Sequence, residues 1–188
     1  MPHNIRYESP RRGTLDVDYG FVHDREGRPT WLAVGNACSR NSRRWSAVVT
    51  LCGQAELDNS RANYIEVCPP PTLMVPLDEM KGGAGRHLPI ISAFVRHYRQ
   101  GVHNSQVLIH CDAGISRGPA IAVFLLMGNG TTSYLENGTS YTEEEAIAAI
   151  KKARPLASPS PVILREVRVH VEYHHFMRSQ SAQLHIGP

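Results

Sequence analysis

Cys111 and Arg117 stand six residues apart, and their side chains could together bind and attack a phosphate group. The apolar run 107–110 comes directly before Cys111, and the apolar run 119–127 follows Arg117 closely. This pattern predicts a buried strand, a tight turn at Gly114 and then a helix. Successive backbone N–H groups of such a turn point inward at the helix N-terminus and form a cradle for an anion. The expected phosphate-binding loop consists of Asp112, Ala113, Gly114, Ile115, Ser116 and Arg117.

Cys111 stands where a nucleophile would be activated. An unperturbed thiol has a pKa of about 8.5, and a helix N-terminus with nearby cationic groups lowers that pKa to roughly 3.5 to 7.5. Arg117 presents a planar fork of donors that matches two phosphate oxygens. The alternative interpretations are a buried, inert thiol at Cys111 and an ordinary surface ion pair at Arg117.

A second group is needed to protonate the alkoxide or phenoxide that leaves when Cys111 is phosphorylated. Asp78 is the first candidate, because it follows the apolar run 73–77 and precedes a glycine-rich segment that could close over a substrate. Glu79 and Asp58 are the second choices. A carboxylate that only caps a turn is the alternative for Asp78.

The elements that must position these residues are predicted from apolar periodicity. Short apolar runs predict buried strands, and longer runs with helical spacing predict helices, so the fold class is α/β with a mostly parallel sheet flanked by helices. Thr142 and Glu145 have the spacing of a capping box at a helix start. The strands are expected near 31–36, 46–52, 73–77 and 107–110, and the helices near 88–102, 119–127, 142–154 and 162–178.

The length of 188 residues suits a single domain, expected at 29–178 after a polar extension at 1–28 and before a tail at 179–188. The formal charge of +3 is too small to indicate a nucleic-acid coat or a membrane surface. The four cysteines form no CxxC pair, which favours reduced thiols in the cytoplasm or the nucleus. No apolar run is long enough to span a membrane.

No metal or organic cofactor is expected. His170 and His174 stand four residues apart on the last predicted helix, with His175 adjacent. Because a metal site needs three or four convergent ligands, these histidines are interpreted as a solvated helix face.

Residues 110–118 resemble the HCxxGxxR signature loop of the protein tyrosine and dual-specificity phosphatases, and the resemblance extends over roughly 30–176. It implies the protein tyrosine phosphatase fold, a phosphocysteine intermediate on Cys111 and the general-acid position at Asp78. It also implies that His110 tunes the loop by hydrogen bonding, although a buried histidine without a catalytic role is the alternative. Further segments that resemble the family, in order, are WLAVGN, AVVTLC, VPLD and KKARPLASPSP.

Two positions depart from the family pattern. Most relatives have Ser or Thr where this chain has Gly118, and that hydroxyl helps the thiolate to leave, so we expect slower breakdown of the intermediate. Ser160 stands where the resemblance leads us to expect an asparagine that braces the loop.

Cys52 ends a strand that should lie beside the strand before Cys111, so the two sulfurs could approach each other. In some similar phosphatases such a neighbour protects the nucleophile through a disulfide, and a thiol of low pKa oxidises first. A packed core cysteine is the alternative for Cys52.

The expected function is hydrolysis of phosphate monoesters, with phosphotyrosine and phosphoserine or phosphothreonine in proteins as the leading substrates. One alternative is a phosphate-binding interaction module with weak or no turnover. Another is an RNA 5′-phosphatase, although nucleic acid is an improbable partner at this charge.

Overall fold

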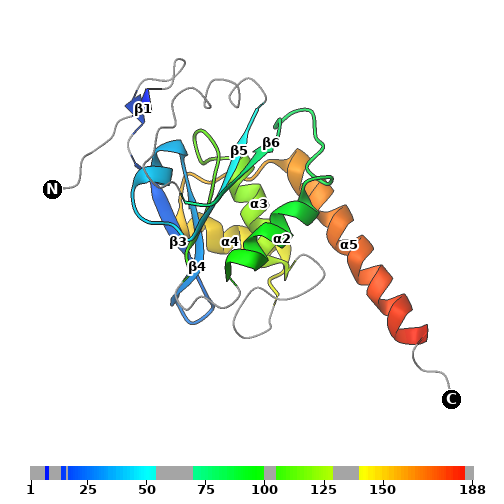
Figure 1. Ribbon diagram of the computed structural model, residues 1–188. Coiled ribbons are helices and arrows are strands. Elements are labelled where there is room, and N and C mark those ends of the chain that lie inside the picture. The colour runs from blue at the N-terminus through cyan, green and yellow to red at the C-terminus, as the bar shows by residue number, and fades with distance from the viewer. Residues whose placement is uncertain are drawn as a thin grey trace.

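The computed structural model describes residues 7–8, 14–15, 17–53, 70–99, 105–128 and 140–184. Their centre is a five-stranded sheet in the order β3-β4-β7-β5-β6 (Figure 1). All neighbours are parallel except β3, which is antiparallel to β4, so the predicted fold class is confirmed. The strands are β3 Tyr19–His23, β4 Pro29–Gly35, β5 Ala47–Cys52, β6 Thr72–Pro76 and β7 Val107–His110, and a separate pair is formed by β1 Tyr7–Glu8 and β2 Thr14–Leu15.

The two strands at the centre of the sheet, β5 and β7, are buried along their whole length. A strand covered on both faces needs a continuous apolar sequence, and for that reason the runs 46–52 and 107–110 predicted these strands. Side chains alternate between the two faces, so Val49 and Ile109 pack on one side and Val48 and Leu108 on the other.

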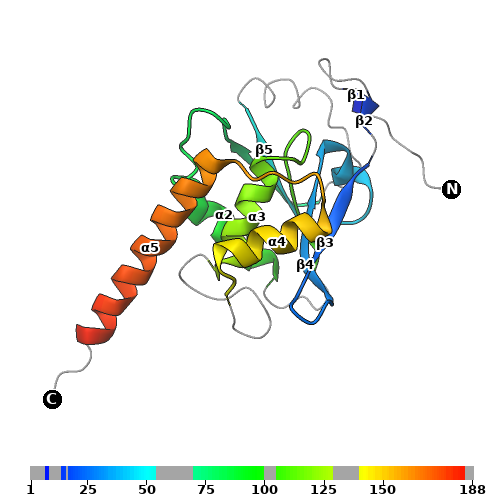
Figure 2. The ribbon, with the colours of Figure 1, turned by 180° about the vertical axis from the view of Figure 1, so that it is seen from behind.

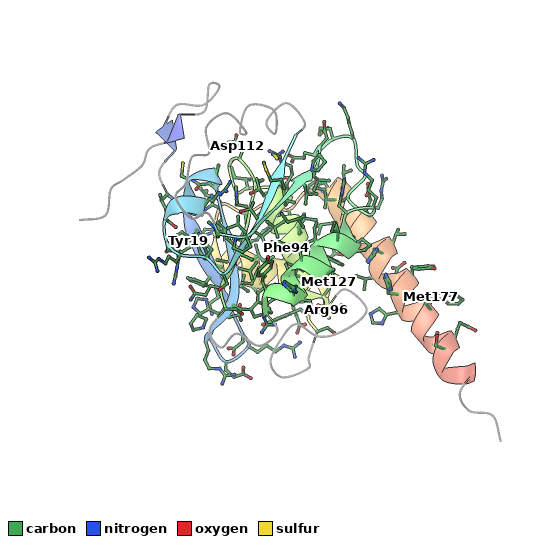
Figure 3. All side chains as sticks on the ribbon, in the orientation of Figure 1. Tyr19, Phe94, Arg96, Asp112, Met127 and Met177 are labelled. Atoms are coloured by element: carbon green, nitrogen blue, oxygen red, sulfur yellow. The ribbon has the colours of Figure 1, made fainter. Side chains whose placement is uncertain are left out.

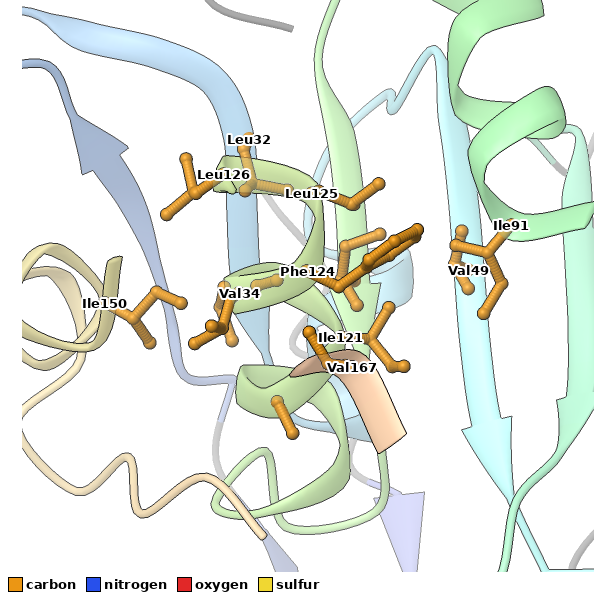
Figure 4. Packing of buried hydrophobic residues seen from close by; sticks show 14 of the residues in the cluster. Leu32, Val34, Val49, Ile91, Ile121, Phe124, Leu125, Leu126, Ile150 and Val167 are labelled. Atoms are coloured by element: carbon orange, nitrogen blue, oxygen red, sulfur yellow. The ribbon is translucent and has the colours of Figure 1, made fainter. Parts of the chain in front are cut away.

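Four helices cover one face of the sheet: α2 Leu88–Arg99, α3 Arg117–Leu126, α4 Glu143–Ala153 and α5 Pro161–Leu184. Helix α3 is the innermost, because every residue from Gly118 to Leu126 is buried. Figure 4 shows Phe124 and Ile121 of α3 among side chains from β4, β5 and the other helices. The capping box of Thr142 and Glu145 is confirmed at the start of α4.

Helix α5 extends well beyond the body of the domain (Figure 2). It ends at Leu184, so it is longer than the predicted helix and includes most of the expected tail. Within the described residues, no helix combines the length and the apolar character that a membrane crossing requires.

An aromatic cluster closes the opposite face of the sheet. Trp45 lies over Val48 and Leu108, and its ring contacts Tyr19 and Phe21 edge-on or tilted. Its indole N–H donates to the carbonyl of Ser39, which belongs to the short helix η1 Ala37–Asn41. This layer fixes η1 at the end of β4, next to the predicted phosphate loop.

Strand β3 lies in the segment that the sequence analysis placed in a polar extension, so the sheet begins before residue 29. Tyr19 and Phe21 of β3 pack in the aromatic cluster, and the buried Val22 packs on the helix side. Gly20 interrupts these apolar residues, so β3 lacks the continuous apolar run of a central strand. Gly20 permits the end of α4 to lie against β3, because a Cβ at this position would stand 1.9 Å from the carbonyl oxygen of Ala153.

Candidate active site

The segment from Cys111 to Ser116 connects the end of β7 to the start of α3, at the edge where the parallel strands end. Figure 3 shows Asp112 at this edge. Gly114 has a φ of +66°, and a Cβ there would lie 2.4 Å from the Gly35 carbonyl oxygen. Only glycine fits this turn without strain, as the sequence predicted.

The carbonyl groups of this loop all bond to the surrounding protein. The Ala37 N–H donates to the Asp112 carbonyl at 3.0 Å, and the Ser158 N–H donates to the Ile115 carbonyl at 2.7 Å. The Ser116 carbonyl accepts from the N–H of Ala120 at 3.1 Å. Because the C=O and N–H of one peptide unit point in opposite directions, outward carbonyls leave the next N–H groups facing the interior of the loop. This is the geometry of an anion cradle.

Arg154 supplies the remaining two contacts. Its Nε donates to the Gly114 carbonyl at 2.7 Å, and its Nη2 donates to the Ala113 carbonyl at 2.9 Å. Its Nη1 donates to the Asp18 carbonyl and lies 2.6 Å from the Asp18 carboxylate. The side chain is only 3% exposed. Arg154 was not predicted as a site residue, although it lies in the segment KKARPLASPSP, which resembles the phosphatases.

Cys111 follows β7 directly and is 3% exposed. Arg117 is in the first turn of α3, and its Nη1 donates to the Leu77 carbonyl at 3.4 Å. That bond brings the segment after β6 next to the predicted phosphate loop. The structure therefore places the predicted nucleophile, the predicted phosphate ligand and the predicted acid segment together.

The two carboxylates of that segment point to different partners. Asp78 accepts the Met80 N–H at 2.9 Å and lies 3.5 Å from the Lys81 ammonium. That N–H and the positive charge of Lys81 lower the pKa of Asp78, so its carboxylate caps its own turn in the ionised form. Glu79 instead accepts the hydroxyl hydrogen of Ser116, within the phosphate loop. The third candidate, Asp58, lies outside the described residues.

Solved structures show the same architecture. The tyrosine phosphatase-like human serine/threonine/tyrosine-interacting protein has a TM-score of 0.57 at 18% identity, and 78% of this chain covers 93% of that chain. Human DUSP28 has a TM-score of 0.55 at 18% identity, with 76% and 88% covered. The chain has the protein tyrosine phosphatase fold. A third neighbour, PTPMT1 in a complex with PI(5)P, has a TM-score of 0.56 at 19% identity, with 80% and 94% covered.

Part of the sequence is similar to dual-specificity phosphatases. Zebrafish (Danio rerio) dual specificity protein phosphatase 22-B is 35% identical over 74 residues, which are 35% of this chain and 36% of that protein. Mouse (Mus musculus) dual specificity protein phosphatase 19 is 36% identical over 64 residues, or 34% and 25% of the two chains. The chain thus spans about a third or less of the length of these relatives, and no family model matches it.

The remaining predicted positions have defined surroundings in this phosphatase fold. A Cβ at Gly118 would lie 3.4 Å from the Cys111 nitrogen, so a small side chain fits there. Ser160 donates its N–H to the Ser116 carbonyl at 3.4 Å, while its hydroxyl oxygen accepts from Ile163 N–H and caps α5. The bond from Ser160 to the loop is therefore made by its backbone.

Cys52 ends β5, which pairs with β7 as predicted. It shares the sheet face of Thr50, two residues earlier. No disulfide joins Cys38, Cys52 and Cys111, the three cysteines that the structure describes, so the redox pairing of Cys52 stays a prediction. Within the described ranges, no three His, Cys, Asp or Glu side chains could hold a metal ion together.

His110 is buried on the face of the sheet opposite the helices. Its Nε2 lies 2.8 Å from the Thr50 hydroxyl, and its Nδ1 lies 3.4 Å from the Cys111 carbonyl. A carbonyl only accepts, so Nδ1 carries the hydrogen and Nε2 accepts from Thr50. Burial, with the positive charges of Arg40 and Arg117, lowers the pKa of His110 to about 4. The ring is therefore neutral near pH 7.

This burial predicts acid sensitivity of the fold. A histidine in the unfolded chain titrates near 6.5, so between that pH and about 4 only the unfolded state takes up the proton. The free energy of unfolding should fall as the pH falls through this window, by up to about 1.4 kcal/mol per pH unit. Urea unfolding from about pH 7 to pH 5 should give a flatter profile for His110→Gln than for wild type. The exposed control His175→Gln should keep the wild-type slope, and parallel profiles for wild type and His110→Gln would contradict the assignment.

Proposed function

We propose that the protein hydrolyses phosphate monoesters in phosphoproteins, with phosphotyrosine and phosphoserine or phosphothreonine as substrates. The observation that carries this proposal is the loop of outward carbonyls that begins at Cys111 and ends at Arg117. Its inward N–H groups and the guanidinium of Arg117 can bind the phosphate oxygens at the N-terminus of α3. A thiolate at the base of that cradle would be in line for attack on phosphorus.

The reaction proceeds in two displacements. In the first, the Cys111 thiolate forms a bond to phosphorus while the bond from phosphorus to the substrate oxygen breaks, and a carboxylic acid gives that oxygen its proton. In the second, water attacks the phosphocysteine, the carboxylate takes a proton from the water, and the S–P bond breaks. Inorganic phosphate leaves, and the thiolate is restored. This chemistry requires a reduced Cys111, which suits the cytoplasm or the nucleus.

We assign the proton transfer to Glu79 in preference to Asp78. The carboxylate of Glu79 contacts the phosphate loop through Ser116, whereas that of Asp78 is engaged in its own turn and has a lowered pKa. A general acid must be protonated before the first displacement, which a lowered pKa opposes.

Paired amide variants test this assignment. Glu79→Gln is expected to lower kcat/KM, which reports the first displacement, about a hundredfold or more with a phenyl phosphate, whose leaving group needs a proton. It should also remove the basic limb of the pH profile of kcat/KM. Asp78→Asn, its matched control, should keep the basic limb of the pH profile and most of the wild-type kcat/KM. The opposite pattern would return the role to Asp78.

Gly118 gives a second prediction. A hydrogen bond to a charged group contributes about 1.5 to 3 kcal/mol, so a hydroxyl near the departing thiolate should speed breakdown of the phosphocysteine about tenfold. Rapid mixing with an aryl phosphate should show a burst in wild type and a faster steady state in Gly118→Ser. Gly118→Ala adds the Cβ without the hydroxyl, so it separates the effect of the hydroxyl from the effect of the added volume. Equal steady-state rates in all three proteins would rule out the missing hydroxyl as the cause of a slow second step.

The proposal as a whole is tested by phosphate release from phosphotyrosine and phosphothreonine peptides, with a chelator present. Sustained turnover of both peptides supports a dual-specificity phosphatase. Tight binding of the peptides without release would instead support an interaction module that uses the same cradle.

A further inference from the structure

The glycine-rich segment that follows Glu79 is fixed to helix α5. Gly82 and Gly83 have φ values of +72° and +88°, and Gly82 forms a bridge with Asp78. The segment thus folds back in a tight turn. The sequence predicted a glycine-rich segment that could close over a substrate, and in the structure the described contacts join this segment to α5.

Glu166 makes those contacts from the second turn of α5. One carboxylate oxygen accepts the Gly83 N–H at 2.7 Å, and the other accepts the Gly85 N–H at 2.7 Å. Hydrogen bonds to an ionised acceptor are about twice as strong as neutral ones. A Cβ at Gly82 would lie 2.5 Å from the same carboxylate, so the approach depends on glycine.

The start of α5 also holds the phosphate loop. Ser160, which caps the helix, donates its N–H to the Ser116 carbonyl, and the Ser116 hydroxyl donates to Glu79. The first two turns of α5 therefore contact the phosphate loop through Ser160 and the acid segment through Glu166. The contact between Glu79 and Ser116 joins these two parts directly.

We propose that Glu166 is a positioning residue that holds the proton donor at the phosphate loop. This inference rests on the proposed phosphatase function. Two carboxylate oxygens accept two N–H groups, and glutamine has only one acceptor to offer, so Glu166→Gln leaves one N–H facing another donor. The variant keeps the size of the side chain and removes one of the two hydrogen bonds that Glu166 accepts from the glycine-rich segment.

Leaving-group dependence separates positioning from a general loss of structure. Glu166→Gln should lower kcat/KM, which reports the first displacement, on the order of tenfold with phenyl phosphate, whose leaving group has a pKa near 10 like tyrosine. With an activated nitrophenyl phosphate, whose nitrophenolate leaves without protonation, kcat/KM should change by less than about twofold. Glu172→Gln, an exposed substitution on the same helix, is the matched control. Equal losses with both substrates would overturn the positioning role.

Tryptic cleavage tests the anchor without any need for activity. Lys81 and Arg86 are exposed cleavage sites within the anchored turn. Under native conditions Glu166→Gln should be cut there roughly tenfold faster than wild type and Glu172→Gln, because a lost charge-assisted bond lets the turn open more often. Unchanged cleavage would overturn the anchor. Faster cleavage in a protein whose wild type releases no phosphate would support the anchor and reject the proposed function.

Discussion

Replacing Cys111 by serine is expected to lower phosphate release from an aryl phosphate by at least about a thousandfold. A serine hydroxyl is a far weaker acid than a thiol, so it cannot supply the ionised nucleophile that the first displacement requires. The substitution changes one buried atom, so the cradle of backbone N–H groups should persist. Phosphate release at saturating substrate is the direct measurement.

Two companion measurements make the result specific. Cys111→Ser should still bind a phosphotyrosine peptide, measured by calorimetry, since binding depends on the loop and on Arg117. Cys52→Ser, a buried cysteine substitution on the neighbouring strand, should keep most of the activity. Full activity in Cys111→Ser would refute the nucleophile assignment.

Arg154→Met is expected to weaken both the fold and the site. The change leaves the carbonyls of Ala113 and Gly114 without their charged donor inside the protein. Loss of such buried contacts costs about 3 kcal/mol in the free energy of unfolding. Once these carbonyls can turn, the inward N–H groups lose their alignment, and kcat/KM should fall about a hundredfold.

Lys151→Met provides the control, since it removes the same charge from an exposed position three residues away. Urea unfolding and aryl phosphate turnover should be measured on wild type, Arg154→Met and Lys151→Met. Only Arg154→Met should lose stability and activity. If Arg154→Met kept wild-type turnover at a temperature where it is folded, the loop would not depend on this arginine.

The parts of the fold that depend on continuous apolar runs could be predicted from the sequence. Strands β5 and β7 and helix α3 are buried throughout, so their apolar residues indicate them without reference to the rest of the chain. The same holds for the phosphate loop, since Gly114 and the flanking elements specify a turn locally. Strand β3 was missed because its sequence, YGFVH, contains no such run.

The site residues that were missed depend on contacts between distant segments. A single arginine in a polar stretch is usually exposed, and nothing local to Arg154 shows that it becomes buried against carbonyls 40 and 41 residues away. Asp78 and Glu79 are adjacent carboxylates, and only the course of the turn decides which one contacts Ser116. The contacts of Glu166 with Gly83 and Gly85 likewise cannot be predicted from the sequence, because they depend on where α5 lies against the glycine-rich segment.

The hydrogen bond from Arg154 to the Asp18 carbonyl joins residues 136 positions apart, so it cannot form until late in the synthesis of the chain. The ribosome completes Asp18 early, then the segment with Cys111, and only later the residues from Arg154 to Ser160 that turn the loop carbonyls outward. Contacts of such long range form late in folding. The nascent chain should therefore carry Cys111 without its cradle, which should assemble only once nearly the whole domain has left the ribosome.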